Sequence, residues 1–320
     1  MPIVVNSNAS ATTASFNLSR ANDALRKSLG RLSSGNRINN PADDAGGLAV
    51  AYKLNSKANR TSAILQNTQN ALSYMQVQDS GLQTAGKIVD RMSELRVMAQ
   101  DITKNSQDIE NYSKEFVELQ SQLNQISKEK FNGISLFATS TVTAVGSLET
   151  STASFGSLSY NTASRTLITH DSGVSTSGSI KLNVVNFQFM LSIGNLSSGA
   201  ATGAAADLGN IDGANAGTGI SSAGFITDIT EVNVSQFTNI IERIADMRAE
   251  NGAEQNRVLN SIDLLQTNLS NIEAAHGRIM DTDIALESTR FARHNILVQA
   301  SAAMTAQANQ MTNIALSLLQ

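Results

Sequence analysis

Apolar residues recur at alternating steps of three and four along two long segments of the chain. The stripe in the first segment consists of Leu65, Thr68, Leu72, Met75, Asp79, Leu82, Gly86 and Val89, most of them apolar, and is extended by Met92, Leu95, Ala99 and Ile102. The stripe in the second segment consists of Val258, Ile262, Leu265, Leu269, Ile272, His276 and Ile279. This spacing is typical of a coiled-coil seam, and about 40 residues rising ~1.5 Å each would give a helix about 60 Å long. The pattern therefore predicts long helices that pack side by side.

Shorter stripes of the same kind occupy both ends of the chain. They include Leu18, Leu25 and Leu32 near the N-terminus, and Leu297, Met304, Met311 and Leu318 near the C-terminus. Because the two ends carry similar stripes, we expect the N-terminal and C-terminal helices to satisfy each other's apolar faces. The simplest arrangement is a long antiparallel bundle built from both ends of the chain.

The middle of the chain, about residues 138–230, has a different composition. It is rich in Gly, Ser, Thr and Ala, and the alternating run SIKLNVVNFQFMLSI at 179–193 predicts strands. The sequence therefore predicts an α+β fold. In this fold a long antiparallel α-helical coiled-coil bundle is formed by the N- and C-terminal segments, with a small β-rich domain inserted between them.

Charge and composition argue against several classes of protein. A formal net charge of -4 and a pI near 5.4 argue against binding to nucleic acid. With no cysteine, the chain has no disulfide framework and no thiolate metal site. No window of about 20 residues is apolar enough to span a bilayer, so we expect no membrane partner. The first residues, MPIVVNSNAS, also lack the basic leader and apolar core of a cleaved secretory signal.

The two ends of the chain are uncharged over long stretches. Residues 1–19 and 294–320 contain no Asp, Glu, Lys or Arg. A solvated coiled coil normally carries charge on its outer face, whereas these segments surround their stripes with amides, hydroxyls and alanines. Little charge repulsion opposes the packing of such a helix against copies of itself. We therefore predict that the seven terminal stripe residues mediate self-assembly, the alternative being a helix pair buried within a large monomer.

The stretch RLSSGNRINNPADDAGGLAV, residues 31–50, combines glycines, asparagines, a proline and two adjacent aspartates. Gly35 suits the position just past the end of a helix. Asn40 suits an N-cap, Pro41 the first helical position and Asp43 the third, as in a capping box. Asp43 and Asp44 also oppose the positive end of the helix that follows. The stretch therefore predicts a joint between two helices, since its acids lack the spacing of a calcium loop.

Residues that could support catalysis are scarce. The three histidines, His170, His276 and His294, do not lie at metal-ligand spacing, and no HExxH, nucleophile elbow or phosphate loop occurs. We therefore predict a protein that is not an enzyme and that has no cofactor and no metal site. An enzyme carried by the middle block would need a polar cluster that the sequence does not display.

Several segments at both ends closely resemble bacterial flagellins. RLSSGNRINNPADDAGGLAV resembles the N-terminal signature of that family, and RMSELRVMAQ (91–100) and FNGISLF (131–137) resemble the segments that follow it. At the other end, GRIMDTDIALEST (277–289), QASAAMTAQANQ (299–310) and LSLLQ (316–320) resemble the C-terminal signature, in the usual order. The resemblance covers about 1–137 and 231–320, some two thirds of the chain.

The resemblance implies a structural subunit that self-assembles into the flagellar filament for motility and is exported without a cleaved signal peptide. It divides the chain as follows: 1–40 an N-terminal inner-core helix, 41–137 the N-terminal part of the helical core, 138–230 a variable outer domain, 231–280 the C-terminal part of the core, and 281–320 a C-terminal inner-core helix. The implied location is the extracellular flagellar filament. The implied partners are further copies of the chain, the flagellar export apparatus, a chaperone, and the cap and hook-junction proteins.

The family also implies a possible contact with the flagellin-sensing Toll-like receptor of animal innate immunity. The matching positions are Arg91, Leu95 and Glu118, the last placed by ELQSQLNQI, and we expect them on the outer helical surface. Two alternative functions remain. A hook–filament junction protein shares similar end motifs, and a secreted adhesin would be exported without contributing to motility.

Overall fold

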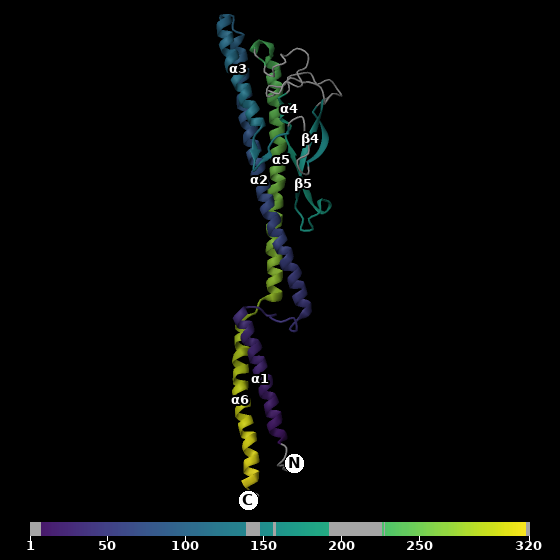
Figure 1. The fold of residues 1–320 in the computed structure, drawn as a ribbon, viewed down its shortest axis with the longest axis vertical. Helices are drawn as coiled ribbons and strands as arrows, with labels where there is room; N and C mark the ends of the chain where they lie inside the picture. Colours follow the sequence, from purple (N-terminus) through teal and green to yellow (C-terminus); the bar gives the residue numbers. More distant parts are fainter. Residues whose placement is uncertain (1–7, 139–147, 156–157, 192–225, 227, 318–320) are drawn as a thin grey trace. The chain divides into compact units, whose positions relative to one another are not determined.

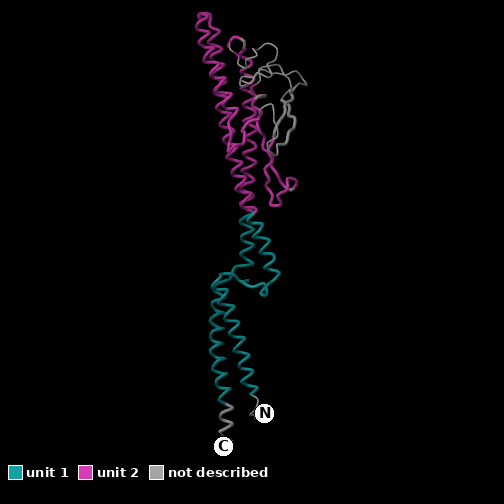
Figure 2. Tube along the Cα trace, viewed as in Figure 1, with its two compact units in different colours: residues 1–59, 268–320 teal, residues 60–267 magenta. Residues whose placement is uncertain are grey.

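The computed structural model describes residues 8–138, 148–155, 158–191, 226 and 228–317. The chain divides into two compact units, which are described separately (Figure 2). Unit 1 comprises residues 1–59 and 268–320, and unit 2 comprises residues 60–267. Two long helices, α2 (Ala45–Ala99) and α5 (Val234–Met280), contribute residues to both units.

Unit 1 is built mainly from α1 (Ala9–Ser34) and α6 (Ile284–Ser317), which lie side by side (Figure 1). Contacts at their two ends show that they are antiparallel. Asn8 Nδ2 donates a hydrogen bond of 2.8 Å to the Ala308 carbonyl, and Arg31 Nη1 lies 3.9 Å from Glu287 Oε2. The side chain of Asn8 also caps α1 by accepting from the Ala11 N–H.

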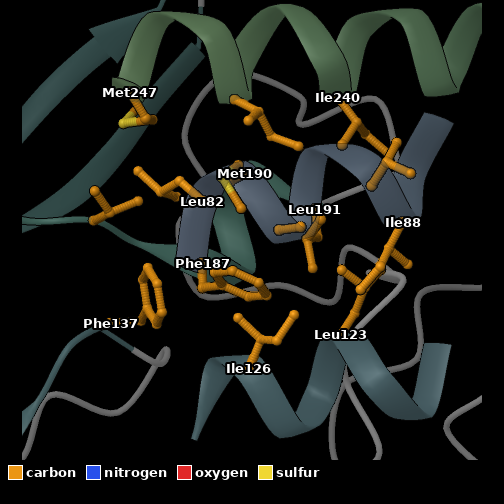
Figure 3. Close-up of a cluster of buried hydrophobic side chains, with 14 of the residues drawn as sticks. Leu82, Ile88, Leu123, Ile126, Phe137, Phe187, Met190, Leu191, Ile240 and Met247 are labelled. Atoms are coloured by element: carbon orange, nitrogen blue, oxygen red, sulfur yellow. The ribbon is translucent and has the colours of Figure 1, made fainter. Parts of the chain in front are cut away.

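Unit 2 contains most of α2 and α5 together with α3 (Ser106–Ser127), packed around an apolar core (Figure 3). The predicted stripes supply much of this core, since Met75, Leu82, Val89, Met92, Leu95, Ala99, Val258 and Ile262 are buried. Phe116 of α3 and Phe237 of α5 meet edge to face with ring centroids 6.1 Å apart. The first stripe ends earlier than predicted, because α2 ends at Ala99 and Ile102 is 99% exposed in the turn that follows.

Two small antiparallel sheets lie in unit 2. The first is the hairpin of β1 (Lys130–Phe131) and β2 (Ile134–Ser135), whose turn residues Asn132 and Gly133 both have positive φ, as a two-residue Asn-Gly turn requires. The second has the order β3-β4-β5, formed by β3 (Leu148–Phe155), β4 (Leu158–Ile168) and β5 (Ser179–Val184). The short elements are α4 (Phe187–Met190) and the 3₁₀ turns η1 (Ser175–Ser177) and η2 (Ile229–Glu231).

The predicted strand at 179–193 is right only for its first part, because β5 ends at Val184 and α4 follows it. Phe187, Met190 and Leu191 are buried in the same core as the strand residues (Figure 3). A short apolar run buried on all sides does not distinguish a strand from a helical turn.

Buried amides fix the points where the chain leaves the helices of unit 2 and returns to them. Gln78 Nε2 donates to the Leu136 carbonyl at 2.9 Å, just before the inserted segment. On the return, Gln120 donates to the Ile226 carbonyl at 2.8 Å and accepts from the Ile226 N–H at 3.1 Å. The long antiparallel helices and the small sheets confirm the predicted α+β fold class.

Candidate assembly surface

The seam that α6 presents to α1 is unusually small and polar. Every residue of 284–310 that is not exposed lies on it, namely Glu287, Phe291, His294, Val298, Ser301, Thr305 and Ala308. These residues recur at steps of four and three, as in a coiled coil. Toward the C-terminal end they are small or hydroxylated, so the two helices can approach closely while burying little apolar surface.

The large apolar side chains of α6 lie elsewhere on the helix. The outer apolar face of α6 consists of Leu286, Ile296, Leu297 and Met304, which are 49%, 66%, 45% and 64% exposed. No Asp, Glu, Lys or Arg occurs between residues 294 and 317. From Ile296 to Met304, α6 therefore carries an uncharged apolar face that α1 does not cover, whereas the exposed Arg290 and Arg293 lie between these residues and Leu286.

This arrangement corrects one prediction about the terminal helices. On α1 the predicted stripe does face α6, since Leu18, Leu25 and Leu32 are half-buried. On α6 the prediction is wrong, because the seam passes through Val298 and Thr305, one residue after Leu297 and Met304. Close packing favours small partners opposite the α1 leucines. The structure does not describe the side chain of Met311, and Leu318 lies outside the described residues.

Two exposed residues of α1 escaped the sequence analysis. Phe16 is 67% exposed and Leu29 is 54% exposed. Both lie off the seven-residue repeat of the seam, so a search for stripes does not find them. The sequence could have indicated both residues, because each is a large apolar side chain away from the stripe. Phe16 also lies within an uncharged segment.

Backbone and side-chain contacts join the end of α1 to the segment before α6 and to the turn before α2. Gly35 ends α1 with φ 71, in the left-handed conformation that the sequence predicted for it. Its carbonyl accepts a hydrogen bond of 2.9 Å from the Thr282 N–H. Lys27 Nζ of α1 lies 2.6 Å from Asp43 Oδ1, and this hydrogen bond lowers the pKa of the Asp43 carboxyl.

The start of α2 lies four residues later than predicted. The sequence assigned the N-cap to Asn40 and the first helical position to Pro41, but residues 41–43 form a turn and α2 begins at Ala45. The Asn40 carbonyl closes this turn by accepting from the Asp43 N–H at 2.9 Å. Asp44 is the cap, since its Oδ1 accepts from the Gly47 N–H at 2.8 Å.

The three residues matched to an immune-receptor contact do not share one surface. Arg91 is exposed and lies 2.8 Å from Glu115 and 3.1 Å from Glu94, and these hydrogen bonds raise the pKa of its guanidinium. Glu118 is also exposed. Leu95 is fully buried in the core of unit 2, so its expected place on the outer surface is wrong.

The described residues offer little that resembles a catalytic centre. No three His, Cys, Asp or Glu side chains among them gather so as to hold a metal ion. His170 Nδ1 contacts Ser172 Oγ at 2.9 Å and Asp171 Oδ1 at 3.3 Å, but a proton relay needs these partners on opposite ring nitrogens. None of the described helices has the length and apolar character needed to cross a membrane.

Both helical ends of the chain match known protein families. Residues 5–141 match the bacterial flagellin N-terminal helical region, and residues 234–319 match the bacterial flagellin C-terminal helical region. Flagellin FlaB2 of Treponema pallidum is 30% identical over 320 residues, covering 99% of this chain and 100% of the relative.

Two further relatives also match almost the whole chain. The flagellar filament 41 kDa core protein of Borreliella burgdorferi is 30% identical over 343 residues, covering 99% of this chain and 100% of the relative. The flagellin of Bacillus subtilis is 29% identical over 320 residues, covering 99% of both chains. The crystal structure of Bacillus cereus flagellin aligns with 66% of this chain and 94% of that chain, at 20% identity and a TM-score of 0.40.

Proposed function

The chain belongs to the bacterial flagellin family and is a structural subunit of the flagellar filament, and on this premise we propose that its terminal helices carry the contacts between copies. The observation that carries the proposal is the outer apolar face of α6, which α1 leaves exposed. Leu18, Leu25 and Leu32 then hold α1 against α6, while Leu297 and Met304 face neighbouring subunits. Met311 and Leu318 continue the same seven-residue repeat.

The size of this face suits a polymer contact. Full burial of a large apolar side chain contributes about 1.5–3 kcal/mol. The four residues of the outer apolar face are already about half covered, so their complete burial would contribute about 3–6 kcal/mol per subunit. Such a gain would be repeated at every subunit of an open helical array, which forms when an asymmetric contact between copies does not close.

Electron microscopy of the purified chain at high concentration tests this role. The parent should form helical filaments, and Leu297→Asp or Met304→Asp should abolish them, because each places a carboxylate on the outer apolar face. Ala302→Asp is the matched control, since Ala302 is an exposed residue of α6 that lies off this face. Normal filaments from both aspartate variants would overturn the proposal. Equal loss with Ala302→Asp would show that the face is wrongly assigned.

The two alternative functions are not favoured, because the relatives that match the whole chain are flagellins and filament core proteins. A hook–filament junction protein should not form long filaments alone, so the same micrographs separate it from a filament subunit. An adhesin is separated by motility, which would survive deletion of its gene.

The remaining assignments follow from family membership and are part of the proposal. The subunit is exported without a cleaved signal peptide and works outside the cell, with the export apparatus, a chaperone, the cap and the hook-junction proteins as partners. It has no enzymatic activity. Residues 1–40 and 281–320 form the inner core, 41–137 and 231–280 the surrounding helical core, and 138–230 the outer domain.

A flagellin-sensing Toll-like receptor is a further candidate partner of the monomer. The supporting observation is that Arg91 and Glu118 are both exposed. A reporter-cell assay with purified monomer and with Arg91→Ala tests it. Loss of signal in the variant supports the contact, and a silent parent protein removes it.

A further inference from the structure

Glu287 is the one acidic residue on the α6 seam, and it is 2% exposed. Its Oε2 lies 3.9 Å from Arg31 Nη1 of α1 and 3.4 Å from Arg290 Nη1 of α6 itself. Its Oε1 accepts no hydrogen bond from the described part of the chain. A carboxylate withdrawn from water this far is costly unless cations lie close to it.

The two arginines differ in whether their contact with Glu287 depends on the alignment of α1 and α6. Arg290 is on the same helix as Glu287, so it stays close however α6 is placed along α1. Arg31 reaches Glu287 only when the two helices are correctly aligned. The contribution of Arg31 to the burial of Glu287 therefore depends on the register of α1 and α6.

Apart from the backbone hydrogen bond that the Thr282 N–H donates to the Gly35 carbonyl at the end of α1, the rest of the α1 seam distinguishes registers poorly. One of its rows repeats leucine every seven residues, at Leu18, Leu25 and Leu32, and the row beside it is formed by Ala14, Ala21 and Ser28. A shift of one heptad, about 10 Å, would set leucine where leucine was and a small residue, alanine or serine, where a small residue was. The same shift would bring Glu287 level with Ala24, seven residues before Arg31. Alanine has no charged side chain to pair with Glu287.

We propose that Glu287 is a positioning residue that fixes the register of α6 along α1. A buried polar side chain that sets register at some cost in stability is a known device of coiled coils. Here it would place the outer apolar face of α6 at a defined height relative to Phe16 and Leu29 of α1. The inference rests on the proposed assembly role, because it concerns a surface composed of both helices.

Distance measurements in filaments test the register directly. The chain has no cysteine, so Ser15→Cys on α1 and Ser288→Cys on α6, both at exposed positions near opposite ends of this helix pair, provide two sites for spin labels. Labelled chains are added as a minority to parent chains before polymerisation, and pulsed electron resonance gives the distance between the labels. The parent should give one distance population.

Four substitutions in the labelled chain complete the experiment. Glu287→Leu and Arg31→Met should each add a second population displaced by about 10 Å, one heptad. Arg31→Lys, which keeps the cation, and Asp23→Asn, which neutralises an exposed acid of α1, should keep the parental distance. Exclusion of Glu287→Leu chains from filaments, with unchanged helix content and normal incorporation of Asp23→Asn, also supports the inference.

Two results would overturn the proposal. One is a single parental distance in Glu287→Leu, and the other is a loss of helix content, which would mean that Glu287 holds α1 and α6 together without aligning them. If the parent itself formed no filaments, the assembly role would fail. The register would then be measured by the same labels in the monomer.

Discussion

Replacing Glu254 with glutamine should change how the stability of unit 2 depends on pH. Glu254 lies on α5, and its Oε1 and Oε2 accept from the Asn183 N–H of β5 at 3.1 and 3.0 Å. Among the strands that the structure describes, β5 pairs with β4 alone, so this carboxyl covers part of its other edge. Burial raises the pKa of Glu254 from 4.5 to about 7, the Asn183 hydrogen bond and Arg257 lower it, and Glu250 raises it further.

The sign of the effect follows from comparing the two states. The folded protein binds the Glu254 proton more tightly than the unfolded chain does, so protonation stabilises the fold. The full contribution is present below pH 4.5 and is lost as the pH rises to about 7. A pKa difference of about 2.5 at about 1.4 kcal/mol for each pH unit sets a ceiling near 3.5 kcal/mol. Because solvent reaches part of the side chain, we expect about 1–2 kcal/mol.

Glutamine keeps an acceptor for the Asn183 N–H but cannot ionise. Glu254→Gln should therefore match the parent in free energy of unfolding near pH 4.5 and exceed it by about 1–2 kcal/mol at pH 8.5. Urea unfolding followed by circular dichroism at several pH values measures the difference. Glu242→Gln, at an exposed position of the same helix, is the control and should show no such trend. A difference that is independent of pH, or a variant less stable than the parent at pH 8.5, would refute the reasoning.

Two further predictions concern packing and the joint. Gly81→Ala should destabilise unit 2 by about 1–3 kcal/mol, because its Cβ would lie 2.8 Å from Cζ of the buried Phe137. Gly252 lies on α5, and a Cβ added there would meet nothing within 4 Å. Gly252→Ala should therefore stabilise unit 2 by about 0.5–1 kcal/mol. The urea midpoints of the two variants measure both effects. Lys27→Met should cost less than about 1 kcal/mol at pH 7, since this partly exposed pair holds the pKa of Asp43 below 3.8. This cost should vanish as the pH falls through the lowered pKa, and a loss that persisted in acid would show that the contact is not electrostatic.

The sequence alone was enough to predict the kinds of elements in this protein. The alternating steps of three and four from Leu65 to Ala99 predicted a long buried stripe, and the structure places its later members in the core. Gly35 was recognisable as a helix end because few other residues adopt positive φ without cost. These predictions succeeded because each depends on local geometry or on a repeat that a helix converts into one face.

Only the tertiary structure decided which residues meet. On α6, two neighbouring rows repeat every seven residues, and the partner selects the row of Val298 and Thr305 over that of Leu297 and Met304. The burial of Glu287 and the contact between Glu254 and β5 likewise join residues far apart in the chain. Periodicity defines the faces of a helix, but it cannot say which face a partner will cover. That choice depends on the volumes and charges that the partner brings to the contact.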